Sequence, residues 1–244
     1  MPPPARSPHY GTRLRIGLLI PCRNTICEPD AAAILPDGIS AHITRMPRLG
    51  DTRDALLAQA GALVQSAQLL AAAQPHVIGF HCTAAATVDA TVGGELADAI
   101  AQATGLPAVA TSQALLAALA SLGARRIVLV TPYTLAVNEH EIAFFAAHGI
   151  EVVGHRWLDK TDALAMSGVE PRDWVAQADA VRRDGADACV LSCANIRVAP
   201  ILAQLEQRLA LPVVSSNQAM FWHCLRSAGS DARVQGYGSL LERH

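Results

Sequence analysis

The chain of 244 residues is rich in aliphatic side chains and almost neutral, which limits the classes of protein to which it can belong. Hydrophobic residues make up 51% and charged residues 16%, so the chain can bury a large core and is neither disordered nor collagen-like. With 19 Lys and Arg against 21 Asp and Glu, the formal net charge is −2. This balance argues against nucleic acid and against a membrane surface as the main partner.

No apolar stretch approaches the roughly 20 residues needed to span a bilayer. Residues 1–13 lack the apolar segment of a secretory signal, and we interpret them as a loose tail. Six cysteines in a chain that needs no disulfides suggest a reducing, cytoplasmic location. Their spacing lacks matching histidines, so we expect no metal site.

Short apolar runs alternate with Ala- and Leu-rich segments of helical period, several of which end at glycine. This alternation predicts an α/β fold with parallel sheets. We expect strands at Arg15–Ile20, Val77–Phe80, Pro107–Ala110, Arg126–Thr131, Glu151–Gly154, Ala188–Ser192 and Pro212–Ser215, and helices at Thr52–Ala73, Gly94–Thr104, Gln113–Leu122 and Trp174–Arg183.

The two halves of the chain resemble each other. An offset of 111 residues relates the runs that begin at Ile16 and Ile127, and it also relates two cysteines that follow apolar runs, Cys82 and Cys193 (193 − 82 = 111). Further on, an offset of 105 residues relates Gln113 to Gln218 within similar segments. The repeat predicts two similar subdomains about a pseudo-twofold axis, which would bring Cys82 and Cys193 to opposite sides of one cleft.

We expect the first subdomain to span residues 14–110 with 217–244, and the second to span residues 111–216. The active site is expected in the cleft between them. The sequence leaves the number of subunits open, a homo-oligomer included.

Three loops that follow apolar runs combine small residues with hydroxyl, amide or thiol groups. They are the segments 21–30, 81–87 and 192–197. Their side chains include Asn24, Thr83 and Asn195, which can orient a substrate by hydrogen bonds without a fixed charge. This pattern is typical of a site for a small carboxylate, and two opposed thiols suit chemistry at a planar carbon between them.

Several motifs resemble those of the aspartate/glutamate racemase superfamily, in the branch of maleate cis-trans isomerases and arylmalonate decarboxylases. They read P-C-R-N-T-I-C-E-P, C-T-A-A-A-T, T-P-Y, S-C-A-N-I-R and V-S-S-N-Q-A, and the likeness runs from about Arg15 to Leu241. The resemblance implies a cofactor-independent isomerase of a small dicarboxylate, with conversion of maleate to fumarate as the leading case.

The resemblance also implies roles for individual residues. Cys82 would add to the double bond of maleate, and Cys193 would donate and accept the proton. Asn24, Tyr133 and Asn195 would hold the two carboxylates, aided by backbone N–H groups at Thr83 and Ala84, and Ala194 would belong to the same binding loop. No metal or cofactor is implied for this thiol chemistry.

Two other features bear on the reaction. Arylmalonate decarboxylases resemble the chain near its end, at Phe221–Trp222 and Gly236–Gly238, but they keep only the second-half cysteine. In maleate isomerases a substrate-holding asparagine usually occupies the position of Ala163. A racemase of an acidic amino acid or related 2-substituted acid, a malonate decarboxylase, and a binding protein without turnover therefore remain alternatives.

The other four cysteines are expected to lack a catalytic role. Cys189 and Cys224 fall inside a predicted strand and helix, where a thiol usually packs as a small hydrophobe. Cys22 and Cys27 lie in the first loop without an evident partner. His81 precedes Cys82, and since neighbours on a strand point to opposite faces, we interpret it as structural.

Overall fold

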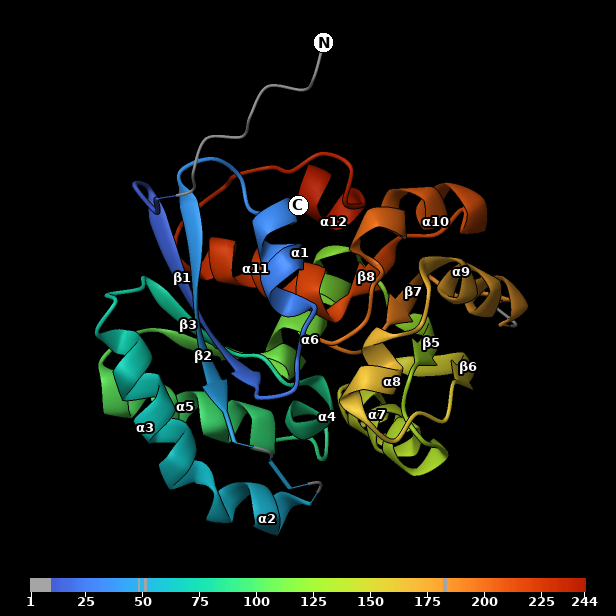
Figure 1. Ribbon diagram of the computed structural model, residues 1–244. Coiled ribbons are helices and arrows are strands. Elements are labelled where there is room, and N and C mark those ends of the chain that lie inside the picture. The colour runs from blue at the N-terminus through green and yellow to red at the C-terminus, as the bar shows by residue number, and fades with distance from the viewer. Residues whose placement is uncertain (1–9, 48, 51, 182–183) are drawn as a thin grey trace.

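Two four-stranded parallel sheets form the framework of the protein (Figure 1). The computed structural model describes residues 10–47, 49–50, 52–181 and 184–244. The strand orders, β2-β1-β3-β4 and β6-β5-β7-β8, are equivalent, which confirms the predicted fold class. The strands are β1 (Leu14–Pro21), β2 (Ile39–Met46), β3 (Val77–Phe80), β4 (Ala108–Ala110), β5 (Arg126–Thr131), β6 (Glu151–Trp157), β7 (Ala188–Leu191) and β8 (Val213–Ser215).

Helices cover both faces of the first sheet. In β1, Ile16 and Leu18 enter a core cluster with α1 and α11, whereas Leu19 enters another with α3 and α5, as the alternation of side chains in a strand requires. The helices are α1 (Cys27–Ile34), α2 (Arg53–Ala58), α3 (Ala60–Ala71), α4 (Thr83–Ala86), α5 (Val92–Thr104), α6 (Thr111–Ser121), α7 (Leu135–Ala147), α8 (Ala163–Ser167), α9 (Pro171–Ala180), the 3-10 turn η1 (Ala199–Ile201), α10 (Leu202–Leu209), α11 (Ser216–Ser227) and α12 (Ser239–Arg243).

None of the helices among the described residues is both long and apolar enough to cross a membrane.

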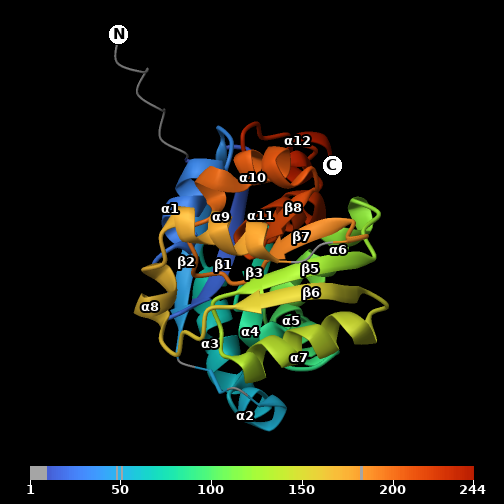
Figure 2. The same ribbon diagram turned by 90° about the vertical axis from the view of Figure 1, so that its right-hand side faces the viewer.

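The internal repeat is visible in the hydrogen bonds of the two sheets. His81 N donates to the carbonyl of Leu19 at 2.9 Å, and Ser192 N makes the matching 2.9 Å bond to Val130, so that both partners keep the offset of 111 residues. Helices α6 and α11, which follow the equivalent strands β4 and β8, pack against each other between the sheets (Figures 1 and 2).

Helix α11 also packs against β3, β4 and α1 of the first half. The boundaries at residues 110/111 and 216/217 stay predictions. Of the proposed tail, residues 1–9 lie outside the described part of the chain, and Arg13 N donates to the carbonyl of Gly38.

Some element predictions were wrong in detail. Strand β2 was missed because the edge strand Ile39–Met46 mixes apolar with polar side chains that are only partly buried. The single helix expected at Thr52–Ala73 is divided into α2 and α3 at Gln59, where φ is −99° and ψ is 1°. Strand β6 runs on to Trp157, and α9 starts at Pro171 and ends at Ala180, before residues 182–183, which lie outside the described part.

Candidate active site

A cavity of about 410 Å³ opens where strands of both sheets end. Its walls come from the loops that follow β1, β3, β5 and β7, the carboxyl ends at which α/β sheets bind ligands. All eight residues singled out in the sequence line this cavity: Asn24, Cys82, Thr83, Ala84, Tyr133, Cys193, Ala194 and Asn195. The structure therefore brings them together, while their roles stay predictions.

The two cysteines lie in different surroundings. Cys82 is partly buried and directly precedes α4; burial raises the pKa of its thiol to about 11, and the N–H of Ala85 acts in the opposite direction. Cys193 is buried, and burial raises the pKa of its thiol to about 12, opposed by the hydroxyl of Tyr133 and the N–H of Asn195. Both groups are thus thiols at neutral pH.

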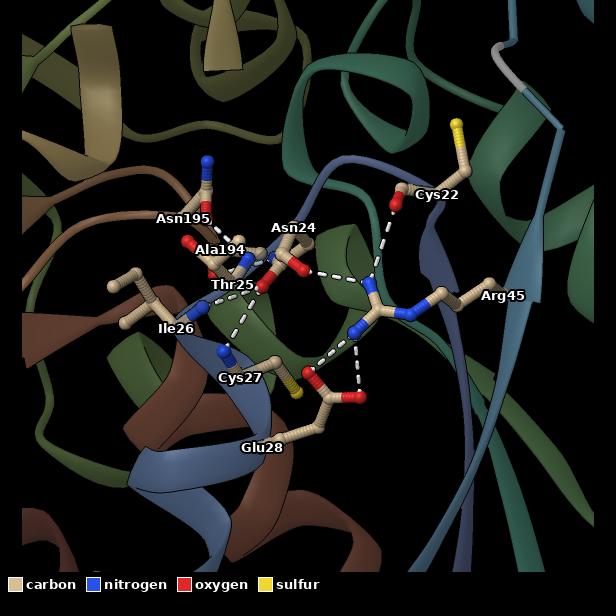
Figure 3. Close-up of polar contacts among 9 residues, drawn as sticks. All are labelled: Cys22, Asn24, Thr25, Ile26, Cys27, Glu28, Arg45, Ala194 and Asn195. Carbon is tan, nitrogen blue, oxygen red and sulfur yellow. Dashed lines mark hydrogen bonds and ion pairs between the residues drawn. The ribbon is translucent and has the colours of Figure 1, made fainter. Parts of the chain in front are cut away.

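The amides of Asn24 and Asn195 join the two halves beside the cavity (Figure 3). Asn24 Nδ2 donates to the carbonyl of Ala194 at 2.8 Å, and its Oδ1 accepts from the N–H groups of Ile26 and Cys27, both at 2.9 Å. Asn195 Oδ1 accepts from Thr25 N at 2.9 Å. Most hydrogen-bonding groups of the two amides are therefore occupied by bonds to the loops themselves.

Among the described residues, Nδ2 of Asn24 bonds only to the carbonyl of Ala194, and Nδ2 of Asn195 bonds only to the carbonyl of Ala163 at 2.8 Å. One N–H of each amide is therefore left for a ligand. The expectation that both residues hold carboxylates is thereby limited to one donated bond each. Thr83 offers a further group, since its hydroxyl is buried without a partner among the described residues.

Arg45 ties the first loop to the end of β2 and to α1 (Figure 3). Its guanidinium donates to the carbonyls of Asn24 at 2.6 Å and Cys22 at 3.3 Å, and its other terminal nitrogen makes bonds of 2.7 and 2.6 Å to the carboxylate of Glu28. Both carboxylate contacts come from one guanidinium nitrogen, while the other terminal nitrogen holds the two carbonyls. Arg45 thus supports Asn24 from outside the cavity.

His81 has a structural environment, as the strand alternation predicts. It is fully buried, does not line the cavity, and bonds to Thr111 Oγ1 at 3.0 Å and Asn217 Oδ1 at 2.7 Å. Burial lowers its pKa to about 4, so the imidazole is neutral. Asn217 Nδ2 in turn donates to the buried carboxyl of Asp30 at 2.7 Å.

The remaining cysteines divide by position. Cys27, Cys189 and Cys224 are buried and do not line the cavity, whereas Cys22 is exposed and lies at its wall. In Figure 3 the sulfur of Cys22 points away from that of Cys27.

Sequence reasoning missed part of the lining. Lys160 and Asp162 follow β6, and Leu49 follows β2. The loop after β2 was missed because that strand was not recognised. The loop after β6 entered the sequence analysis only at its end, through the resemblance, because β6 was drawn three residues too short. The rule that strand ends line the site would have included both loops. Other residues of the lining that were not predicted are polar, such as Thr134 and Thr161, or apolar, such as Val88 and Met166.

Fold and cavity together define an α/β protein of two similar parallel sheets, with a pair of cysteines at equivalent strand ends in one cavity. The chain belongs to the arylmalonate decarboxylase family, whose sequence profile matches residues 16–241. This confirms the resemblance seen in the sequence.

Curated relatives and solved structures bear two enzyme names. The chain is 32% identical to arylmalonate decarboxylase of Bordetella bronchiseptica, over 93% of this chain and 96% of that protein. It is 29% identical to maleate isomerase of Nocardia farcinica, over 94% and 96%. A mutant of the Nocardia farcinica maleate cis-trans isomerase with a covalently bound succinylcysteine intermediate superposes with a TM-score of 0.88 at 27% identity, covering 95% of this chain and 99% of that one.

Proposed function

We propose that this protein is a cofactor-independent isomerase that converts maleate to fumarate through a covalent adduct on Cys82. The observation that carries the proposal is the presence of two thiols, Cys82 and Cys193, in one cavity at equivalent strand ends. The succinylcysteine in the Nocardia farcinica enzyme supports the same chemistry here.

The reaction requires two changes at the sulfur atoms: Cys82 forms and breaks a C–S bond, and Cys193 gives and takes back a proton. The Cys82 thiol first loses its proton to solvent. The thiolate then adds to one alkene carbon of maleate, forming the C–S bond, while the π electrons move toward the other carbon and take the proton of the Cys193 thiol. The C2–C3 bond is now single and can rotate. Cys193 then takes the proton back, the C–S bond breaks, and fumarate leaves.

The cavity supplies donors for two carboxylates. The remaining N–H of Asn24 and of Asn195, the buried Thr83 hydroxyl and the first N–H groups of α4 lie on its walls. Lys160 adds a cationic side chain at the same cavity. This lining fits a small dianion.

Decarboxylation of a substituted malonate is the second candidate. Ala163, Val88, Val137 and Met166 give one part of the cavity an apolar lining that maleate does not need, and the relative at 32% identity is a decarboxylase. Against it stands Cys82, since a decarboxylase of the implied type uses the second-half thiol alone.

One NMR experiment separates these functions. The protein is incubated in D2O with maleate, phenylmalonate or aspartate, which report isomerisation, decarboxylation and α-hydrogen exchange. We expect fumarate from maleate, and mass spectrometry of the Cys193→Ser variant should show a succinyl adduct on the peptide that contains Cys82. Release of carbon dioxide from phenylmalonate without fumarate formation would contradict this proposal and indicate a decarboxylase. Exchange of the α-hydrogen of aspartate alone would indicate a racemase.

A further inference from the structure

A fully buried carboxyl group lies where the two cysteine-bearing loops meet. Glu141, on α7, accepts a hydrogen bond from Ser192 Oγ at 2.9 Å, and Ser192 directly precedes Cys193. The hydroxyl of Thr87, at the end of α4, lies 3.4 Å from the same Glu141 oxygen and also donates to the carbonyl of Thr83 at 2.9 Å. One carboxyl group therefore touches both loops without lining the cavity.

The other oxygen of Glu141 is buried without a partner among the described residues. Burial raises the pKa of this carboxyl to about 8, against the hydrogen bonds from Ser192 and Thr87. The titratable groups that interact with its charge are Cys193 and Tyr133, and both in turn interact with Cys82. A charge on Glu141 thus disfavours a second negative charge on the Cys193 sulfur.

The repeat shows that this arrangement is specific to the second thiol. In the repeat, Asp30 occupies the position equivalent to Glu141, and His81 occupies the position equivalent to Ser192, since each pair is 111 residues apart. Asp30 reaches His81 only through Asn217, whereas Glu141 bonds directly to Ser192. The two thiols therefore differ in their supporting acids.

We propose that Glu141 is a positioning residue that holds the loop of Cys193 against α4 and, when ionised at alkaline pH, keeps Cys193 as the thiol that gives its proton to the substrate. The inference rests on the proposed function for the proton transfer. Its effect on the sulfur can be measured without substrate.

The test compares alkylation of Cys193 by iodoacetamide in Cys82→Ser and in Cys82→Ser with Glu141→Gln, from pH 6 to pH 10, quantified by mass spectrometry. Glutamine keeps an acceptor for Ser192 and removes the charge. We expect equal rates at pH 6, where the carboxyl is protonated, and alkylation about fivefold faster in the glutamine variant above pH 8. With maleate, Glu141→Gln alone should move the alkaline limb of kcat to lower pH.

Coincident alkylation profiles at every pH would overturn the inference, as would an equal rate change at all pH values, which a merely structural role predicts. Should the Gln variant not fold, Ser192→Ala in the Cys82→Ser background serves instead: loss of the hydroxyl delays ionisation of Glu141, so alkylation between pH 8 and 9 should rise, and an unchanged rate contradicts the proposal. Absence of turnover with maleate bears only on the proposed function.

Discussion

Cys82 and Cys193 occupy equivalent places in the two sheets, yet their neighbours assign them different tasks. Cys82 is the more exposed thiol, stands at the start of α4, and has an N–H group near its sulfur that favours the thiolate. Cys193 also has donors that favour its thiolate, the Tyr133 hydroxyl and the N–H of Asn195, but its deeper burial and the nearby Glu141 disfavour a negative charge on the sulfur. The first is suited to attack and the second to donate a proton.

Replacing the nucleophile should therefore remove most of the activity. We expect Cys82→Ser to lower kcat for maleate roughly a thousandfold or more, because the covalent route is lost. Cys189→Ser and Cys224→Ser serve as controls, since both sulfurs are buried outside the cavity. Steady-state kinetics measure kcat for the three variants. Similar losses in all three would contradict the assignment of Cys82 as the nucleophile.

Ala163 offers a test of substrate preference at the same scale. Its side chain lines the cavity, while its carbonyl accepts the bond from Asn195 and would be kept in any substitution. We expect Ala163→Asn to lower the KM for maleate about fivefold by one added hydrogen bond, worth about 1 kcal/mol, with kcat little changed. A KM that rises, alongside unchanged thermal unfolding, would show that this position does not face the carboxylates.

At the scale of elements, the sequence predicted the buried strands and the loops after them better than the edges of the sheets. Runs such as Val77–Phe80 are apolar at every position because both faces are covered, and the repeat marks the cysteines that follow them. Edge strand β2 contains Ser40, His42 and Arg45, so its pattern is not that of a buried strand. Hence Leu49, beyond its end, could not be foreseen, whereas Cys82 and Cys193 could.

The link between β2 and the first loop has a testable consequence. Arg45→Ala removes bonds to the carbonyls of Asn24 and Cys22 as well as the ion pair, whereas Glu28→Gln leaves the carbonyl bonds in place. Since exposed ion pairs contribute little, we expect KM for maleate to rise about fivefold in Arg45→Ala and less than twofold in Glu28→Gln. Equal effects from both variants would show that the ion pair, and not the carbonyl bonds, orders the loop.

At the scale of the whole molecule, helix α11 near the C-terminus packs against α1 and β3 near the N-terminus. Asn217 on α11 connects Asp30 on α1 with His81 after β3, three segments that are far apart in sequence and fully packed in the fold. This connection could not be foreseen from sequence patterns, because the three residues belong to no shared motif and lie far apart in the chain. Only the packing of α11 against β3 and α1 brings them together.

Asp30 and His81 should make opposite contributions to stability as the pH changes. Burial raises the pKa of Asp30 from 3.8 to about 6, so the free energy of unfolding falls as the pH rises through this range. Burial lowers the pKa of His81 from 6.5 to about 4, so the free energy of unfolding falls as the pH decreases from 6.5 toward 4. Between pH 4 and pH 6 the two dependences oppose each other, so the contributions of Asp30 and His81 largely cancel.

Asp30→Asn removes one of the two opposed dependences and keeps an amide that Asn217 can bond. The variant should then lose stability relative to wild type on acidification, by roughly 2 kcal/mol between pH 6 and pH 4, because it lacks the carboxyl that binds a proton more strongly in the folded than in the unfolded chain. Urea unfolding followed by circular dichroism at pH 4, 5 and 6 measures the difference, with the exposed Gln207→Ala as control. Parallel stability curves for Asp30→Asn and wild type would contradict the prediction, because they would show that the pKa of Asp30 is the same in the folded and the unfolded chain.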